Sequence, residues 1–350
     1  MTKVHITAAQ AVTAIGLTAV TTTASVRAGI RRIYEHELYP DEEGFPLSVA
    51  PLPSHQDRAD PFDRVAPAAV QATRALMQSF DPTHDRGRPC HLLLGCAHPD
   101  RGGALFERPD DMLPVVLASE LGGLFDTPQI QIFPYGNPAA LFALDAAREL
   151  LAREPRAVCI VGGIDSLLGE ELLERLEEDE RLKSEGYDNP HGISPGEAVG
   201  LLAVEAAEAR TPRRPLAQVE GLTVGHEPRP YSSEQPSVYE GLTGVCRGAM
   251  LEARATDDEI DAVLIDLDGE HHRAHEWATV EIRCLGPRQP LRRLVHPAEG
   301  YGTIGAASAA LLLAIVATSR GWLDGLDLVL ASDDDGPCGA AVLRRQWRGH

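Results

Sequence analysis

One short stretch of the chain gathers side chains that can move protons or bind a metal ion. It contains Asp268, Glu270, His271, His275 and Glu276. His271 and His275 are four residues apart, so on a helix they share one face and with a carboxylate can bind zinc. The spacing matches no defining zinc motif, and we predict no metal. Two interpretations remain open: a network of carboxylates bound to loop amides, or general acid and base chemistry by Glu270 or Glu276 with a histidine.

A second stretch offers a binding position where a helix begins. Tyr135 leads into Asn137 and Pro138, and small residues follow. Pro138 suits the first helical position, and Asn137 is a good N-cap because its side chain can accept a hydrogen bond from a free helix amide. A helix N-terminus carries a positive dipole and free N–H groups. The sequence therefore predicts that a nucleophile, an oxyanion or a phosphate would be placed at Asn137.

Alternating strands and helices must position these two stretches. The apolar patterns predict one series of elements in the first part of the chain and a second series after a linker at 211–215. We expect an irregular surface loop over 39–61, which is rich in Pro, Asp and Ser, and an acidic helix over 167–183 with a solvated face. The other expected elements are strands at 3–10, 91–96, 129–133, 157–163, 198–205, 216–224 and 262–268, and helices at 17–28, 66–80, 111–121, 139–151 and 238–253.

Composition excludes several classes of function. The formal net charge of -20 over 350 residues argues against a nucleic-acid partner, because neutralising phosphates needs clustered Lys and Arg. No long apolar run suggests a membrane span or a signal peptide, so we expect a cytoplasmic protein. The six cysteines form no CxxC pair and are interpreted as reduced thiols. No cofactor is expected.

Three segments resemble the beta-ketoacyl synthases of the thiolase-like superfamily. The segment 139–163 is similar to the one that follows the active-site cysteine of that family, and 196–205 and 300–317 resemble two of its glycine-containing motifs. The resemblance implies an α/β thiolase-like fold, with two similar halves in a five-layer αβαβα arrangement. It assigns 1–210 to the N-terminal half and 216–350 to the C-terminal half. It also implies that the strand at 129–133 is the edge of a dimer.

The same resemblance implies that the condensing chemistry of the family is absent. Its cysteine and two histidines would fall on Asn137, Asp268 and Gly302, and a shift of one residue would put Tyr301 in place of the last. A decarboxylative condensation needs a thiolate to carry the acyl chain and imidazole donors to stabilise the enolate. The loop at 332–339 also lacks the family's phenylalanine. The implied vestigial pocket contains Tyr135, Asn137, Asp268, Glu270, His271, His275, Glu276 and Tyr301.

Three functions follow from this interpretation. The first is a non-catalytic partner, scaffold or adaptor: the silent half of a ketosynthase pair, or an accessory protein with a client. The pattern Asp268-Gly269-Glu270, Arg273 and Glu276-Trp277 resembles degenerate proteins associated with type VI secretion effectors. The second is an enzyme of altered chemistry on acyl-thioesters: acyl transfer, hydrolysis or decarboxylation. The third is a protein that binds an acyl or pantetheine ligand.

The acyl tunnel separates the first two functions. A scaffold predicts a short or filled tunnel, plugged by Phe133, Tyr135, Phe142 or Tyr301, whereas an altered enzyme predicts an open tunnel that reaches Glu270 or His271. We expect a homodimer or a heterodimer with a related subunit. The net charge disfavours an acidic acyl carrier protein as partner unless arginines gather into a basic patch. The candidate arginines are Arg31, Arg32, Arg213 and Arg214, or Arg288, Arg292 and Arg293.

Overall fold

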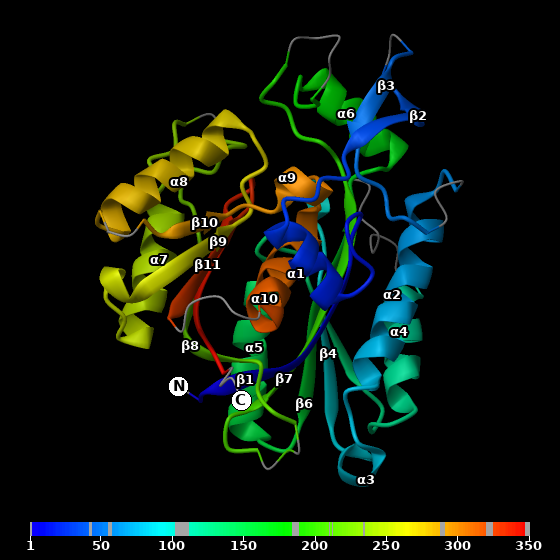
Figure 1. Ribbon diagram of the computed structural model, residues 1–350, viewed down its shortest axis with the longest axis vertical. Helices are drawn as coiled ribbons and strands as arrows, with labels where there is room; N and C mark the ends of the chain where they lie inside the picture. Colours follow the sequence, from blue (N-terminus) through cyan, green and yellow to red (C-terminus); the bar gives the residue numbers. More distant parts are fainter. Residues whose placement is uncertain are drawn as a thin grey trace.

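Ten strands form one continuous sheet through the middle of the protein. The computed structural model in Figure 1 describes residues 2–41, 44–54, 58–101, 112–183, 189–209, 211, 213–233, 235–287, 291–319 and 325–346. The N-terminal strands are β1 (Val4–Val12), β4 (Cys90–Gly95), β5 (Gln129–Phe133), β6 (Val158–Ser166) and β7 (Glu197–Ala206). The C-terminal strands are β8 (Ala217–His226), β9 (Ile260–Ile265), β10 (Arg293–Val295), β11 (Leu326–Ser332) and β12 (Pro337–Arg345).

The two sets of five strands have the same topology. The N-terminal order is β1-β7-β6-β4-β5, and the C-terminal order is β8-β12-β11-β9-β10. In each set the first three strands are antiparallel and the last three are parallel. The sets join through a short antiparallel pairing of β1 with β8, where Val4 lies opposite Val219. This duplication confirms the two similar halves. β7 ends at Ala206, and the exact boundaries at 210 and 216 stay a prediction.

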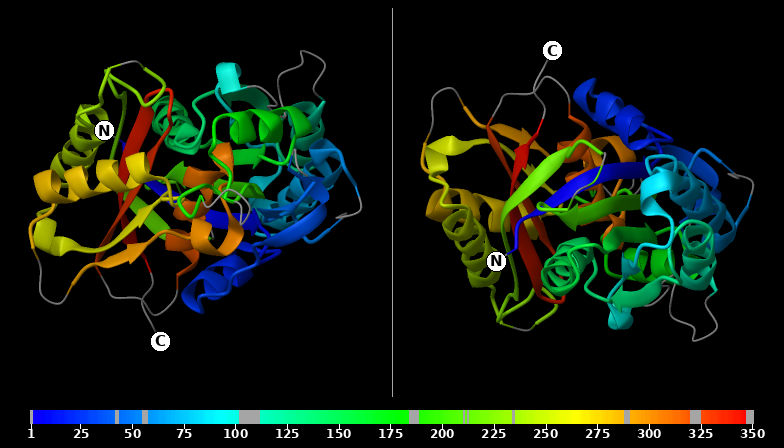
Figure 2. Two further views of the ribbon diagram at one scale, coloured as in Figure 1. Left: turned by 90° about the horizontal axis from the view of Figure 1, so that it is seen from above. Right: turned by 90° about the horizontal axis from the view of Figure 1, so that it is seen from below.

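Helices complete the five layers. The central helices α5 (Ala139–Arg153) and α10 (Ser308–Thr318) contact strands of both sets. The pair α2 (Pro61–Met77) and α4 (Leu113–Gly122) covers the N-terminal strands, and α7 (Glu240–Ala253) with α8 (His271–Cys284) lies on the opposite side (Figures 1 and 2). Every residue from 308 to 317 is buried, because α10 packs against strands of both sets. The predicted thiolase-like fold in five αβαβα layers is confirmed.

One glycine lets the third family-like motif reach the sheet. A Cβ added at Gly163 in β6 would lie 2.1 Å from the carbonyl oxygen of Ala306. Only a residue without a side chain permits this approach. It places residues 305–307, which precede α10, against the end of β6, where the turn before α5 also lies.

Several expected element boundaries were wrong. The segment 39–61 is not irregular throughout: β2 (Tyr34–Pro40) pairs with β3 (Pro46–Val49), because Leu47 and Val49 bury their side chains against α6. The acidic helix α6 is shorter than expected (Glu170–Glu178). Helix α2 begins at Pro61, where Asp60 accepts a hydrogen bond from the Phe62 amide. The remaining α-helices in the described residues are α1 (Ala19–Arg27), α3 (Pro82–Asp85) and α9 (Ala298–Tyr301). No described helix meets the length and hydropathy needed to cross a membrane.

A fully buried ion pair ties the N-terminal loops to β7. The side chains of Arg64 and Glu197 are both 0% exposed, and Arg64 Nη2 lies 2.6 Å from Glu197 Oε1. Glu197 also accepts hydrogen bonds from the Leu52 amide (3.0 Å) and the Ser166 hydroxyl (2.9 Å). Glu197 therefore anchors the loop that contains Leu52, and Arg64 of α2 supplies the compensating charge.

Replacing Arg64 by Met should lower the free energy of unfolding by about 3–5 kcal/mol, because Glu197 would keep a buried and unpaired charge. Denaturant unfolding measures this change. The matched control is Arg74→Met, which breaks the solvent-exposed pair of Arg74 with Glu120 and should leave stability almost unchanged. Equal effects of the two substitutions would contradict the role given to Glu197.

Candidate functional site

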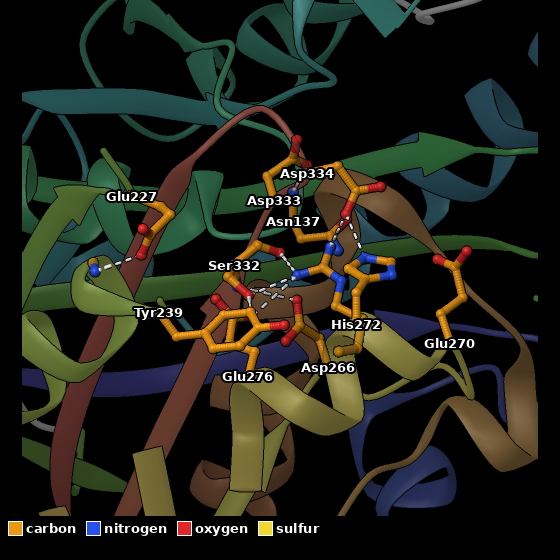
Figure 3. Close-up of polar contacts among 12 residues, drawn as sticks. Asn137, Glu227, Tyr239, Asp266, Glu270, His272, Glu276, Ser332, Asp333 and Asp334 are labelled. Carbon is orange, nitrogen blue, oxygen red and sulfur yellow. Dashed lines mark hydrogen bonds and ion pairs between the residues drawn. The ribbon is translucent and has the colours of Figure 1, made fainter. Parts of the chain in front are cut away.

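The loop between β11 and β12 connects the elements around the candidate site. This acidic loop, Ser332–Gly336, contains three consecutive aspartates. Asp333 contacts the turn before α5, and Asp334 contacts α8 and Arg181. Asp335 lies 3.4 Å from Nδ1 of His98, which follows β4. Figure 3 shows Asn137 of the N-terminal half beside Asp333, Asp334 and His272 of the C-terminal half.

Asp333 accepts the hydrogen bond of the Asn137 amide, the position at which the sequence predicted a nucleophile, an oxyanion or a phosphate. The backbone N–H of Asn137 donates a hydrogen bond to Asp333 Oδ2 over 3.0 Å. The preceding Gly136 has a φ of +62°, and a Cβ there would lie 1.8 Å from Asp333 Oδ2. Position 136 therefore requires glycine for two reasons: its backbone conformation, and the carboxylate that packs against it. Asp333 thus accepts the hydrogen bond that this amide would otherwise offer to an external oxyanion.

The prediction that Asn137 caps the helix was wrong. Helix α5 begins at Ala139, its N-cap is Pro138, and no side chain makes a capping hydrogen bond. The amide of Ala139 donates instead to the carbonyl of Gly136 at 2.9 Å, and that of Leu141 to Pro138 at 2.8 Å. The turn thus satisfies these amides with its own carbonyl groups, which leaves no capping role for the Asn137 side chain.

One buried guanidinium holds the site together. The Arg273 side chain is 6% exposed, and its Nη1 donates to the carbonyl and the hydroxyl of Ser332, both at 2.6 Å. Its Nη2 lies 3.2 Å from Asp334, and Glu276 is 3.8 Å from Nη1. Glu276 in turn accepts a hydrogen bond from the Ser332 hydroxyl. Arg273 therefore clamps the acidic loop onto α8.

Arg273 cannot neutralise all the carboxyl groups around it. Burial raises the pKa of Asp266 to about 7 and that of Asp268 to about 6, although Arg273 opposes both shifts. Burial likewise raises the pKa values of Glu276 and Asp333. Asp334 behaves differently: burial opposes its ionisation, but Arg273, His272 and Arg181 hold its pKa well below the usual range. The site thus combines one carboxylate that stays ionised, Asp334, with two carboxyl groups, Asp266 and Asp268, that take up protons near neutral pH.

The three positions assigned to the family's triad lie around one closed pocket. Asn137, Asp268 and Gly302 line it together with Asp266 and Tyr301, and its volume is about 10 Å³. A water molecule needs roughly 10–15 Å³ measured in this way, so an acyl chain does not fit into this pocket. Asn137 and Asp268 also line a cavity of about 530 Å³, together with Arg273 and the aspartates of the acidic loop. Tyr301 is 2% exposed, and burial raises its pKa. Among the described residues that line this pocket, none has a thiol or an imidazole.

Only one of the four aromatic residues expected to plug a tunnel lines this pocket. That residue is Tyr301. Tyr135 instead stacks on Phe142 with ring centroids 4.1 Å apart, and Phe133 is buried in the central core. Tyr135 therefore belongs to the packing around α5 and not to the lining of the described pocket.

The remaining predicted residues line an open cavity beside the closed pocket. This cavity of about 620 Å³ is lined by Glu270, His271, His275 and Glu276, among others. His271 packs against His191 with ring centroids 3.9 Å apart. Asp268 does not line the cavity, and its Oδ1 accepts a hydrogen bond from the Glu270 amide at 3.1 Å. This contact supports the loop-amide network suggested by the sequence.

The described carboxylates and imidazoles include one group with a spacing suitable for a metal ion. Ligand atoms of Glu270, His272 and Asp334 lie within 4.8 Å of one another. Arg181 already contacts both carboxylates, with Nη2 2.6 Å from Glu270 Oε2 and 2.6 Å from Asp334 Oδ2. This guanidinium supplies the positive charge that a cation would bring. His271 and His275, the pair expected on one helix face, are not part of the group.

Sequence reasoning missed several important residues of this site. Arg181, Asp266 and the adjacent Asp333 and Asp334 come from three separate segments, and no local spacing connects these segments. The run of three aspartates directly after a buried strand was the available signal.

The arginines expected to form basic patches are grouped differently in the structure. Arg31 and Arg293, which the sequence analysis placed in different patches, line one cavity of about 540 Å³, whereas Arg213 is buried with Asp85 and Glu205. Arg288 lies outside the described residues.

Solved ketosynthase structures share this architecture. "The ishigamide ketosynthase/chain length factor" matches with a TM-score of 0.72 and 22% identity over 99% of both chains. The complex AntDE:AntF, a type II PKS acyl-carrier protein with its ketosynthase bound to the hexaketide, matches with a TM-score of 0.79 and 14% identity over 98% of this chain and 99% of that one. The ketosynthase from module 6 of the bacillaene synthase from Bacillus subtilis 168 matches with a TM-score of 0.75 and 13% identity, over 99% and 72% of the two chains.

The likeness establishes the fold. No protein-family model and no curated protein sequence matches the chain. The chain has the thiolase-like fold of beta-ketoacyl synthases, as the sequence resemblance implied.

Asp266→Asn should stabilise the protein at neutral and alkaline pH but not in acid. The folded-state pKa of about 7 lies above the unfolded value of about 3.9, so ionisation of Asp266 removes stability as pH rises between those values. The gain in unfolding free energy from Asp266→Asn should therefore grow from near zero at about pH 4 to about 2–4 kcal/mol at about pH 8. Denaturant unfolding across this range measures it.

The control for that experiment is Asp63→Asn, an exposed carboxylate on α2. Its effect on stability should change little over the same range of pH. A pH-independent effect of Asp266→Asn would show that Asp266 is ionised throughout and would contradict the account of the buried carboxyl group.

Proposed function

We propose that this chain is a non-condensing ketosynthase-like subunit that pairs with a related subunit. The observation that carries the proposal is the hydrogen bond from the Asn137 amide to Asp333 over 3.0 Å. An acyl-enzyme would need a nucleophile at this turn and an empty oxyanion position. Here the turn carries an amide side chain, and an aspartate of the same chain fills the position.

The described cysteines offer no substitute nucleophile at this site. Cys96 lies next to the turn before α5, because its carbonyl oxygen accepts a hydrogen bond from the Gly136 amide at 3.0 Å. Its thiol is buried, and burial raises its pKa to about 12. A thiol with that pKa is almost entirely protonated at neutral pH and reacts poorly. The proposed loss of condensing activity therefore does not depend on the register of one motif.

The strand β5 supplies the proposed pairing surface. It is the last strand of the sheet, so one side of its backbone has no neighbouring strand among the described residues. Ile130 and Ile132 are 39% and 36% exposed, and Val115 and Val116 of the adjacent α4 are 49% and 38% exposed. An exposed strand edge next to apolar side chains is suited to pairing with another chain. The solved ketosynthase/chain length factor supports a related subunit as that partner.

Other parts of the proposal rest on the sequence alone. A cytoplasmic location follows from the charge and the lack of a long apolar run. An adaptor role toward a client protein, in a type VI secretion setting, follows from the resemblance around Asp268.

A second candidate function is acid and base chemistry on a ligand in the open cavity. The observation in its favour is Glu276, a carboxyl group on the cavity wall whose pKa is raised by burial. Such groups occur often at functional sites. Turnover of an acyl-thioester that is lost in Glu276→Gln and kept in Glu281→Gln, an exposed position on the same helix, would favour this function over the first.

Placing charge on β5 should abolish pairing. The double substitution Ile130→Lys and Ile132→Asp puts charges where apolar side chains would be buried, so the complex should dissociate at least 100-fold more readily. Light scattering after gel filtration measures the mass of this chain alone and of the chain co-expressed with a ketosynthase subunit from the same genome. Ile282→Lys, at an 83% exposed position on α8, is the control. Pairing that survives the double substitution would overturn the assignment of β5.

A further inference from the structure

A cavity of about 540 Å³ lies where α1, β10 and α9 meet, and we call it the basic cavity. The chain that leaves α1 turns back at once, because the Ile30 amide donates a hydrogen bond to the Ser25 carbonyl at 2.9 Å. The Arg32 amide then donates to the Gly300 carbonyl at 2.8 Å, which ties this segment to α9. Residues of β10 complete the lining.

Basic side chains outnumber acidic ones around the basic cavity. Arg27 and Arg31 come from the end of α1 and the segment after it, whereas Arg293 and His296 come from β10 and the turn after it. Glu299 is the one acidic residue among the described residues of the lining. The fold thus gathers three guanidinium groups from distant parts of a chain whose net charge is -20. Guanidinium groups bind phosphate well, because their planar set of donors matches the phosphate oxygens.

A carboxylate of the protein itself shows where an anion is favoured. Arg31 Nη2 lies 2.8 Å from Glu299 Oε2, and His296 Nδ1 lies 3.2 Å from Glu299 Oε1. Arg31 and Glu299 are both exposed, and exposed ion pairs contribute little to stability. The Glu299 side chain can therefore turn out to solvent at small cost. A phosphate group carries more charge and more acceptor oxygens than a carboxylate, so it is suited to replace Glu299 at both contacts.

Apolar side chains form much of the remaining lining. Val26 and Ile30 come from the end of α1, and Leu294, Val295 and Pro297 come from β10 and the turn after it. Ile30 and Leu294 are 49% and 39% exposed, so an apolar group that covers them removes apolar surface from water. The volume also exceeds that of a phosphate ion and lies within the ~300–1,000 Å³ typical of small-molecule pockets. A ligand that fits therefore has both a phosphate group and an apolar body.

We propose that the basic cavity binds a small phosphorylated molecule with an apolar body. Arg31 and His296 bind the phosphate group in place of Glu299, and Arg293 adds positive charge. The apolar body packs against Ile30 and Leu294. Binding here is independent of the pairing proposed for β5, since none of the described residues of β5 or α4 lines the basic cavity.

Isothermal titration calorimetry of the full-length protein with phenyl phosphate tests this site. One equivalent should bind, about 10-fold more tightly than inorganic phosphate, because the ring buries apolar surface. Benzyl alcohol, which lacks the phosphate group, should not bind measurably. Co-sedimentation with vesicles of phosphatidylcholine and phosphatidic acid distinguishes a soluble ligand from a lipid headgroup. No saturable binding of phenyl phosphate, equal affinity for inorganic phosphate, or binding to the vesicles alone would overturn the proposal.

Substitutions at exposed positions locate the binding in the basic cavity. Arg31→Gln and Arg293→Gln should each weaken phenyl phosphate binding about 10-fold or more, because each removes a charged donor. Arg153→Gln, which removes an exposed arginine of α5, is the control and should leave the affinity unchanged. Glu299→Gln removes the competing carboxylate, so it should strengthen binding. Unchanged affinity in both arginine variants of the cavity, or weaker binding in Glu299→Gln, would contradict the assignment.

Discussion

The hydrogen bond between the Asp333 carboxylate and the Asn137 amide joins the two halves of the protein at the candidate site. The duplicated topology brings the turn before α5 close to the loop after β11. Gly136 leaves room for the carboxylate, and Arg273 and Arg181 hold the acidic loop that carries it. Because this loop comes from the C-terminal half and the turn from the N-terminal half, the contact depends on the correct packing of both.

The candidate site must accommodate negative charge that the fold removes from water. A chain with a net charge of -20 gathers several carboxyl groups around Arg273. Groups in the closed pocket, such as Asp266, lower their cost of burial by taking up a proton. Glu270, on the open cavity, is instead paired with Arg181. Protonation and ion pairing are thus two solutions to one problem, the burial of negative charge.

The sequence predicted the layers well and the site only in part. Buried strands and the small-residue helix α5 have strong local patterns, and 139–163 and 300–317 identified the fold. The pairs Arg64–Glu197 and Arg181–Asp334 join residues that are far apart in the chain, so no local pattern shows them. Asn137 illustrates the limit, since its neighbours predicted a capping residue, whereas the Asp333 carboxylate and the backbone carbonyl of Gly136 satisfy the amides of the turn. Such tertiary contacts override local preference.

Intact-protein mass spectrometry after incubation with a panel of acyl-CoA and acyl-carrier thioesters tests the central claim most directly. A beta-ketoacyl synthase of known activity is run in parallel to show that each thioester is competent. The account predicts no covalent acyl adduct on this chain, because the turn before α5 carries Asn137 in place of a cysteine and the Asn137 amide already donates its hydrogen bond to Asp333. An acyl adduct that peptide mapping localises to one residue of this site would contradict the account.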